Sequence, residues 1–163
     1  MEKDKESCLE DLKKKYSELQ TKHGLPDFDE MNKDFAIEKV SEVETDFLLR
    51  EIRRFVSDRF ANYLRFIEEI LHPTNASMFI FSVIKSLGEK GKEKFTGVYK
   101  KLANLEIELM ELDISYDEEK EVVFVKKAYE TWQEVKKDLL ESVGEIKKNW
   151  DNKIEANGKG YFG

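Results

Sequence analysis

The sequence predicts an all-α fold, a single-domain bundle of five to six helices with a long C-terminal helix. Only ten of its 163 residues are Gly or Pro, and none lies between Asp27 and His72 or between Val98 and Val143. Both stretches are rich in Glu, Lys and Leu, which are good helix formers. Apolar residues also recur at steps of three and four, the spacing of one helix face. These three observations together indicate long amphipathic helices.

The first third of the chain is expected to hold two helices and the beginning of a third. A helix over about 4–23 should end at Gly24, which suits the left-handed position after a helix. A shorter helix should follow the capping residue Asp27. A capping-box pattern at Ser41 and Glu44 predicts a bend near Val40 and a long central helix over 42–71. The first helix has a narrow apolar seam formed by Leu9, Leu12, Tyr16 and Leu19.

The rest of the chain is expected to form three more helices. One over about 75–87 is apolar almost all round, which predicts burial on several sides. After a turn at Gly88–Gly91, the next helix should run to Ile114. The last should reach Ile154, although residues 114–125 also have a hairpin-like pattern, and we favour the helix. Its apolar positions repeat with an eleven-residue period, and they are Trp132, Val135, Leu139, Val143, Ile146, Trp150 and Ile154.

Composition narrows the class of protein. The formal net charge is −7 and the pI is near 5.1, a balance that disfavours a dedicated nucleic-acid binder. The chain has no apolar run of membrane-spanning length and begins without a signal-peptide pattern, so we expect a cytoplasmic chain without membrane association. The predicted organisation is a helical domain over 1–156 and a flexible tail over 157–163. The high content of Lys and Glu is compatible with a thermophilic source.

The residues that commonly carry catalysis or bind metals are sparse. There is one cysteine, Cys8, and there are two histidines. Glu69 and His72 form a single Glu-x-x-His motif without the second motif that a di-iron bundle needs. The glycines at 88 and 91 lack the spacing of a phosphate-binding loop. We therefore expect no enzyme activity, no metal and no cofactor.

The arginines are concentrated in one place. All five lie between residues 50 and 65, on the predicted central helix. Arg59 falls within the apolar stripe of that helix, where its guanidinium needs either an internal carboxylate or a partner's. We favour the internal ion pair and keep the partner-facing role as the alternative. The candidate network consists of Arg50, Arg54, Arg59 and Arg65.

Two further features are candidates for binding. Residues 85–101 have a net charge of +4, with aromatic side chains between the lysines. The candidate basic patch is formed by Lys90, Lys92, Lys94, Lys100 and Lys101. The tail contains the adjacent pair Tyr161 and Phe162, a candidate anchor for a partner groove.

The sequence thus favours a non-catalytic helical interaction module, an adaptor or subunit of a larger assembly with an unknown protein partner. A homodimer is also compatible with it. A nucleic-acid-associated accessory factor that uses the Lys90–Lys101 segment is the alternative, because lysines interleaved with aromatic residues can follow a nucleic-acid backbone.

Overall fold

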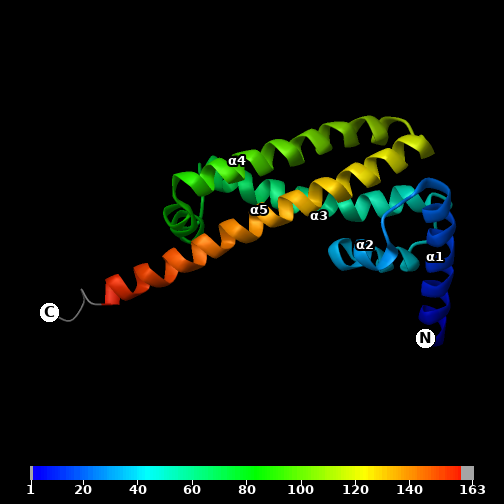
Figure 1. The fold of residues 1–163 in the computed structure, drawn as a ribbon, viewed down its shortest axis with the longest axis horizontal. Coiled ribbons are helices and arrows are strands. Elements are labelled where there is room, and N and C mark those ends of the chain that lie inside the picture. The colour runs from blue at the N-terminus through cyan, green and yellow to red at the C-terminus, as the bar shows by residue number, and fades with distance from the viewer. Residues whose placement is uncertain (1, 159–163) are drawn as a thin grey trace. The chain divides into compact units, whose positions relative to one another are not determined.

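The structure is a computed structural model that describes the chain from Glu2 to Gly158, with side chains described from Glu6 to Trp150. The described chain is helical, as predicted, and contains no strand, so the segment 114–125 does not form a hairpin (Figure 1). The elements are α1 (Glu2–His23), α2 (Phe28–Phe35), the 3₁₀ helix η1 (Ile37–Glu42), α3 (Leu48–Leu71), α4 (Met78–Ile114) and α5 (Glu118–Gly158).

The helices divide into two compact units. Unit 1 comprises Met1–Ala61 and Leu105–Thr131, and unit 2 comprises Asn62–Asn104 and Trp132–Gly163. Charge is divided unevenly between them. Unit 1 has 25 acidic and 15 basic residues, a net charge of −10, whereas unit 2 has 10 acidic and 13 basic residues, a net charge of +3.

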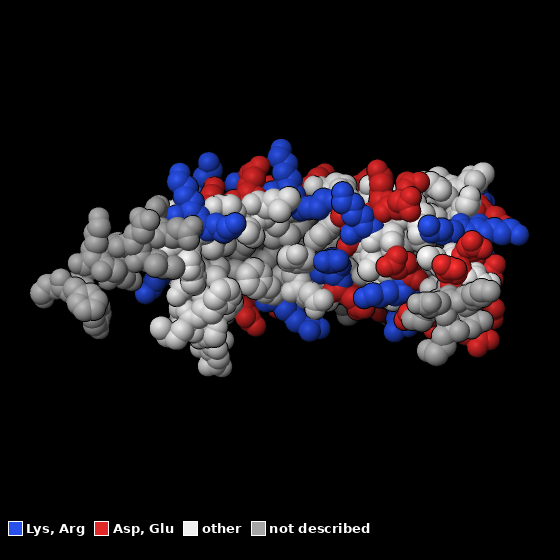
Figure 2. All heavy atoms as spheres, turned by 90° about the horizontal axis from the view of Figure 1, so that it is seen from below, with Lys and Arg blue, Asp and Glu red and all other residues white. Residues whose placement is uncertain are grey.

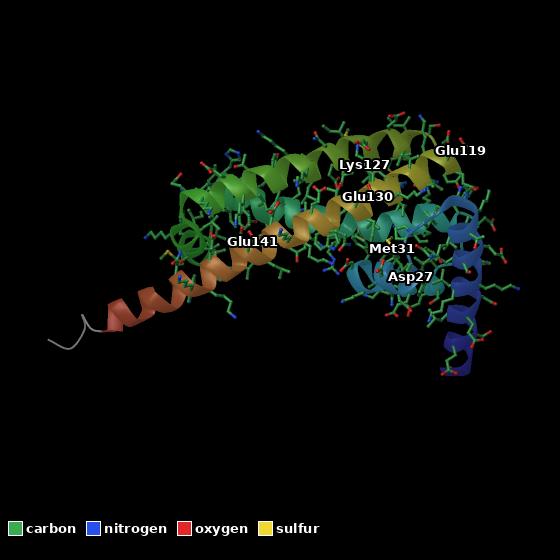
Figure 3. The ribbon with its side chains drawn as sticks, in the orientation of Figure 1. Asp27, Met31, Glu119, Lys127, Glu130 and Glu141 are labelled. Atoms are coloured by element: carbon green, nitrogen blue, oxygen red, sulfur yellow. The ribbon has the colours of Figure 1, made fainter. Side chains whose placement is uncertain are left out.

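In unit 1, α1 packs on η1 and α2 through the predicted seam. Leu12 and Tyr16 are its buried members. The Tyr16 hydroxyl donates a hydrogen bond of 2.7 Å to the Pro26 carbonyl, and its ring meets Phe28 edge-on with centroids 5.3 Å apart. Asp27 caps α2 as predicted, because its carboxylate accepts from the backbone N–H of Asp29 (Figure 3). These contacts hold the first two helices together.

The predicted beginning of the central helix is wrong. The Ser41 hydroxyl does not cap a helix but donates to the Glu38 carbonyl at 2.7 Å, inside η1. The helix α3 begins later, at Leu48. Ahead of it, the Thr45 hydroxyl accepts from the Phe47 N–H at 2.9 Å. The 3₁₀ turn thus lies where a bend was predicted, and the link over residues 43–47 is non-helical where the central helix was expected to have begun.

The turn expected at Gly88–Gly91 is a kink at a single residue. Gly88 has φ 68° and ψ 176°, a conformation open almost only to glycine, whereas the rest of α4 continues as helix on both sides. Gly91 is buried within the helix, with the Leu87 side chain lying where a Cβ would be. The segment Met78–Leu87 therefore runs in a different direction from the remainder of α4.

The apolar spacing of α5 also differs from the eleven-residue period. Val143 is 47% exposed, and Ser142 is buried in its place. From Val125 onward the buried positions alternate in steps of three and four, the 3.5-residue average of a heptad. They are Val125, Ala128, Trp132, Val135, Leu139 and Ser142, and the beginning of the helix also buries Glu121, Val122 and Phe124.

Within each unit, α4 and α5 run antiparallel. In unit 2, Lys94 pairs with Glu141 at 2.8 Å and Lys101 with Glu134 at 2.9 Å, so higher numbers on α4 meet lower numbers on α5. In unit 1 the same order appears, because Glu111 of α4 pairs with Lys120 of α5 at 2.7 Å and the earlier Glu108 pairs with the later Lys127. The short link between Ile114 and Glu118 requires this direction.

Candidate functional site

Three apolar side chains stand exposed on the part of α4 that belongs to unit 1. Ile107 and Met110 are each 66% exposed, and Ile114 is 87% exposed. Their spacing of three and four residues places them along one line of the helix, opposite the buried Leu105, Leu109 and Leu112. We call Ile107, Met110 and Ile114 the α4 stripe. A stripe at this spacing is the pattern by which a second helix packs.

A groove of about 350 Å³ lies beside the α4 stripe, between α4 and α5. Leu112 and Phe124 are its deeply buried apolar lining, and the exposed Val123 adds to it. Three carboxylates and one ammonium complete the lining, from Glu108, Glu111, Glu119 and Lys120. The groove is therefore apolar in its depth and mostly acidic at its rim.

Neighbouring helices contribute the charged side chains at this groove. Lys120 donates to Glu111 at 2.7 Å, and Lys127 pairs with Glu108. The hydrogen bond with Glu111 raises the pKa of Lys120. Figure 3 shows Glu119 and Lys127 on α5 near its beginning. The Glu111 side chain remains 71% exposed, so its carboxylate is still open to a further cation.

The core of unit 1 contains a buried ion pair. Arg53 and Glu121 are 2% and 0% exposed, and Arg53 Nε lies 2.7 Å from Glu121 Oε2. Arg53 Nη1 also donates to the exposed Asp113 at 2.8 Å. Burial raises the pKa of Glu121, and the Arg53 guanidinium opposes this shift. This buried ion pair uses Arg53, an arginine that the predicted network left out.

The four arginines of the predicted network lie elsewhere. Arg59 is half-buried and Arg65 is exposed. Arg54 pairs with Glu51 at 3.0 Å on the same helix. Arg50 lies over the ring of Tyr116, 5.6 Å from its centroid. Arg50 and Arg54 therefore have separate neighbours, Tyr116 for the one and Glu51 for the other.

The lysines of the predicted basic patch largely meet carboxylates of the chain itself. Lys92 pairs with Glu89 at 3.0 Å. Lys94 lies 2.8 Å from Glu141 and 3.7 Å from Glu145, and the hydrogen bond with Glu141 raises its pKa. Lys101 pairs with Glu134, whereas Lys90 and Lys100 are exposed. These pairs reduce the positive charge that the patch offers to an anion.

The beginning of α4 is not buried on several sides, as its apolar composition predicted. Met78 is 81% exposed, Phe79 61% and Phe81 41%, while Ile80, Val83 and Leu87 face the core of unit 2. The ring of Phe79 contacts Trp150, with centroids 5.9 Å apart. Figure 2 shows few charged side chains around this part of the molecule. Unit 2 therefore has an apolar surface of its own.

Sequence reasoning missed the α4 stripe. The helix over 92–114 contains two sets of apolar residues at helical spacing, and only the larger set faces the core. The smaller set was present in the sequence as a signal that a second face of this helix is apolar.

The other residues singled out in the sequence are not brought together. Cys8 is exposed on α1, and Glu69 and His72 are exposed near the end of α3. Among the described residues, no group of three His, Cys, Asp or Glu side chains is placed to hold a metal. No helix within Glu2–Gly158 combines the length and apolar content needed to cross a membrane.

Tyr161 and Phe162 lie outside the described residues. The comparisons with known proteins add no functional assignment. No protein-family model matches this chain, and no curated protein or solved structure is detectably similar to it.

Proposed function

We propose that this protein is a non-catalytic helical interaction module that binds a partner protein through the α4 stripe. The observation that carries the proposal is the exposure of Ile107, Met110 and Ile114 on one line of a helix whose opposite face is already buried. Single exposed apolar residues are common, but a row of three at heptad spacing matches an unfilled helix-packing seam.

The test compares the wild-type chain with the double variant Ile107→Ser and Ile114→Ser. Each chain is immobilised and exposed to an extract of the source cells, and the bound proteins are quantified by mass spectrometry. Leu140→Ser is the matched control, because Leu140 is 67% exposed and lies in unit 2. We expect the double variant to lose a protein that the wild type and the control both retain. Equal capture by all three chains would contradict the proposal.

The alternative function, nucleic-acid binding through the Lys90–Lys101 segment, is tested by a separate experiment. A nucleic-acid binder releases counterions, so its affinity falls steeply with salt. Fluorescence anisotropy with single-stranded DNA and RNA measures this directly. We expect no salt-dependent binding, because Lys92, Lys94 and Lys101 already pair with carboxylates. Binding that is lost in Lys90→Glu and Lys100→Glu variants would favour the nucleic-acid function instead.

A further inference from the structure

From the surroundings of the α4 stripe, we infer that its partner is a basic amphipathic helix. The partner helix has apolar residues at i, i+3 and i+7 against Ile107, Met110 and Ile114, and Lys or Arg residues on both sides of them. This inference rests on the proposed function and specifies the chemistry of the partner.

A helix fits the stripe because of its length and narrowness. The stripe runs from Ile107 to Ile114, seven steps along α4, or about 10 Å. Its three side chains fall within about 60° of one another around the helix axis. Such a narrow row matches the two-per-heptad seam of a packed helix better than the broad area that a sheet or a globular surface covers.

The partner must be basic because carboxylates border the stripe on both edges. Helix geometry places Glu106 and Asp113 along one edge and Glu111 along the other. Asp113 and Glu111 each have an internal cationic neighbour, yet their side chains are 63% and 71% exposed. The net charge of −10 on unit 1 adds a long-range attraction for a cationic partner.

The groove beside the stripe provides a place for one long basic side chain. Its depth, lined by Leu112 and Phe124, suits the methylene stem of a Lys or Arg, and the rim carboxylates suit the charged head. Val123 extends the apolar lining toward the surface. A basic helix seated on the stripe can insert such a side chain past Glu111, which borders both features.

The same charges disfavour two other occupants. A second copy that used its own α4 stripe would bring two sets of carboxylates together, and like charges facing each other oppose association. A nucleic acid would meet the same repulsion from unit 1. The stripe therefore selects against self-association as well as for a basic helix.

The test titrates the full chain with synthetic helical peptides of about 20 residues, long enough to hold a helix on a partner. The basic peptide has Leu at the seam positions and Lys on both flanks. A second peptide has Glu in place of every Lys, and a third has the basic composition with the seam disrupted by Ser. Fluorescence anisotropy of the labelled peptide measures each dissociation constant.

We expect only the basic peptide with an intact seam to bind. The double variant Ile107→Ser and Ile114→Ser should weaken it at least tenfold, while Leu140→Ser leaves it unchanged. Glu111→Gln should weaken it severalfold, and Glu134→Gln should not. Glu134 is the matched control because it also pairs with a lysine across α4 and α5, and it is 66% exposed. Raising the salt from about 0.1 M to 1 M should weaken binding, because the screening length falls from about 10 Å to 3 Å.

Each of the following results would overturn the inference. Binding of the acidic peptide as tightly as the basic one would remove the charge argument. Equal binding of the basic peptide by the wild type and the double variant would place the site elsewhere. A wild-type dimer in sedimentation that the double variant loses would identify a second copy as the occupant.

The two experiments distinguish a failure of this inference from a failure of the proposed function. If the double variant loses its cellular partner but no basic peptide binds, the interaction module stands and the basic helix is wrong. If neither the cellular partner nor a peptide depends on the stripe, both are wrong.

Discussion

Arg53 on α3 and Glu121 on α5 form an ion pair inside unit 1, with Nε and Oε2 2.7 Å apart and both side chains almost completely buried. The Nε–H is not aligned with that oxygen, so the contact is an ion pair without a regular hydrogen bond. Asp113 adds a second carboxylate to the guanidinium from the end of α4. Arg53 of α3 therefore contacts both α4 and α5, and all three residues belong to unit 1.

Arg53→Ala should destabilise the chain by about 3–5 kcal/mol, because it leaves Glu121 buried without its counter-ion. Arg59→Ala is the control from the same helix, and its half-buried side chain predicts a cost below about 1 kcal/mol. Chemical denaturation measures both, and hydrogen exchange should show that the Arg53 effect lies in unit 1. A larger cost for Arg59→Ala would mean that Arg59 has the internal role.

Glu121 should make the stability depend on pH. Burial raises its pKa in the folded chain above the ordinary value of 4.5, so the folded state binds more protons than the unfolded state. The stability from this group is fully present below its ordinary pKa and is lost as the pH rises through the raised value. The free energy of unfolding of the wild type minus that of Glu121→Gln should therefore fall as the pH rises above the ordinary pKa of 4.5. A difference that grows over this range would show that Arg53 dominates instead.

Gly88→Ala should destabilise the chain by about 1–3 kcal/mol. No neighbouring atom lies within 4 Å of the new Cβ, so the whole cost comes from the backbone conformation of the kink. Gly97→Ala is the matched control on the same helix, since its Cβ also meets open space and its backbone is helical. That change should stabilise the chain by about 1 kcal/mol. Equal effects of the two changes in thermal unfolding would contradict a kink that requires glycine.

Tyr16→Phe should cost about 0.5–1.5 kcal/mol by removing the part-buried hydrogen bond to the Pro26 carbonyl. Tyr129→Phe removes a similar bond of 2.8 Å to Glu30 at a more exposed position, and we expect a smaller cost. Denaturation midpoints give the two costs. Hydrogen exchange of the α1 amides should rise in Tyr16→Phe alone, and unchanged exchange would mean that other contacts hold α1 in place.

The all-α class and the long C-terminal helix could be predicted because they depend on local patterns. Which arginine of α3 is buried could not be predicted from those patterns. The deeply buried residues of α3, such as Ile52, Val56 and Phe60, centre on a direction that lies about 60° from both Arg53 and Arg59. The prediction counted Phe55 and Phe66 among the core residues, which moved the predicted centre of the buried face of α3 toward Arg59. Both side chains are only half-buried. The choice depends on Glu121, which lies far away in the sequence.

Errors at the α4 surface and in α5 have a related cause. The composition of Met78–Leu87 shows that the segment is apolar, but the kink at Gly88 decides how much of it is covered. In α5, Ser142 is buried and Val143 is not, which contradicts their ranking by hydrophobicity. The beginning of α3 was misplaced because Ser41 and Glu44 have the residue types of a capping box without its geometry.

The alternating steps of α5 restrict how its length can change among related chains. Seven residues turn a helix by about 700°, which returns the next buried position to within about 20° of the same face. Within unit 2, removing one residue between Trp132 and Val135 would instead rotate the buried positions that follow by about 100° relative to Trp132, which would expose Val135 and Leu139. We therefore expect insertions and deletions in related sequences to avoid this helix or to occur there in steps of seven.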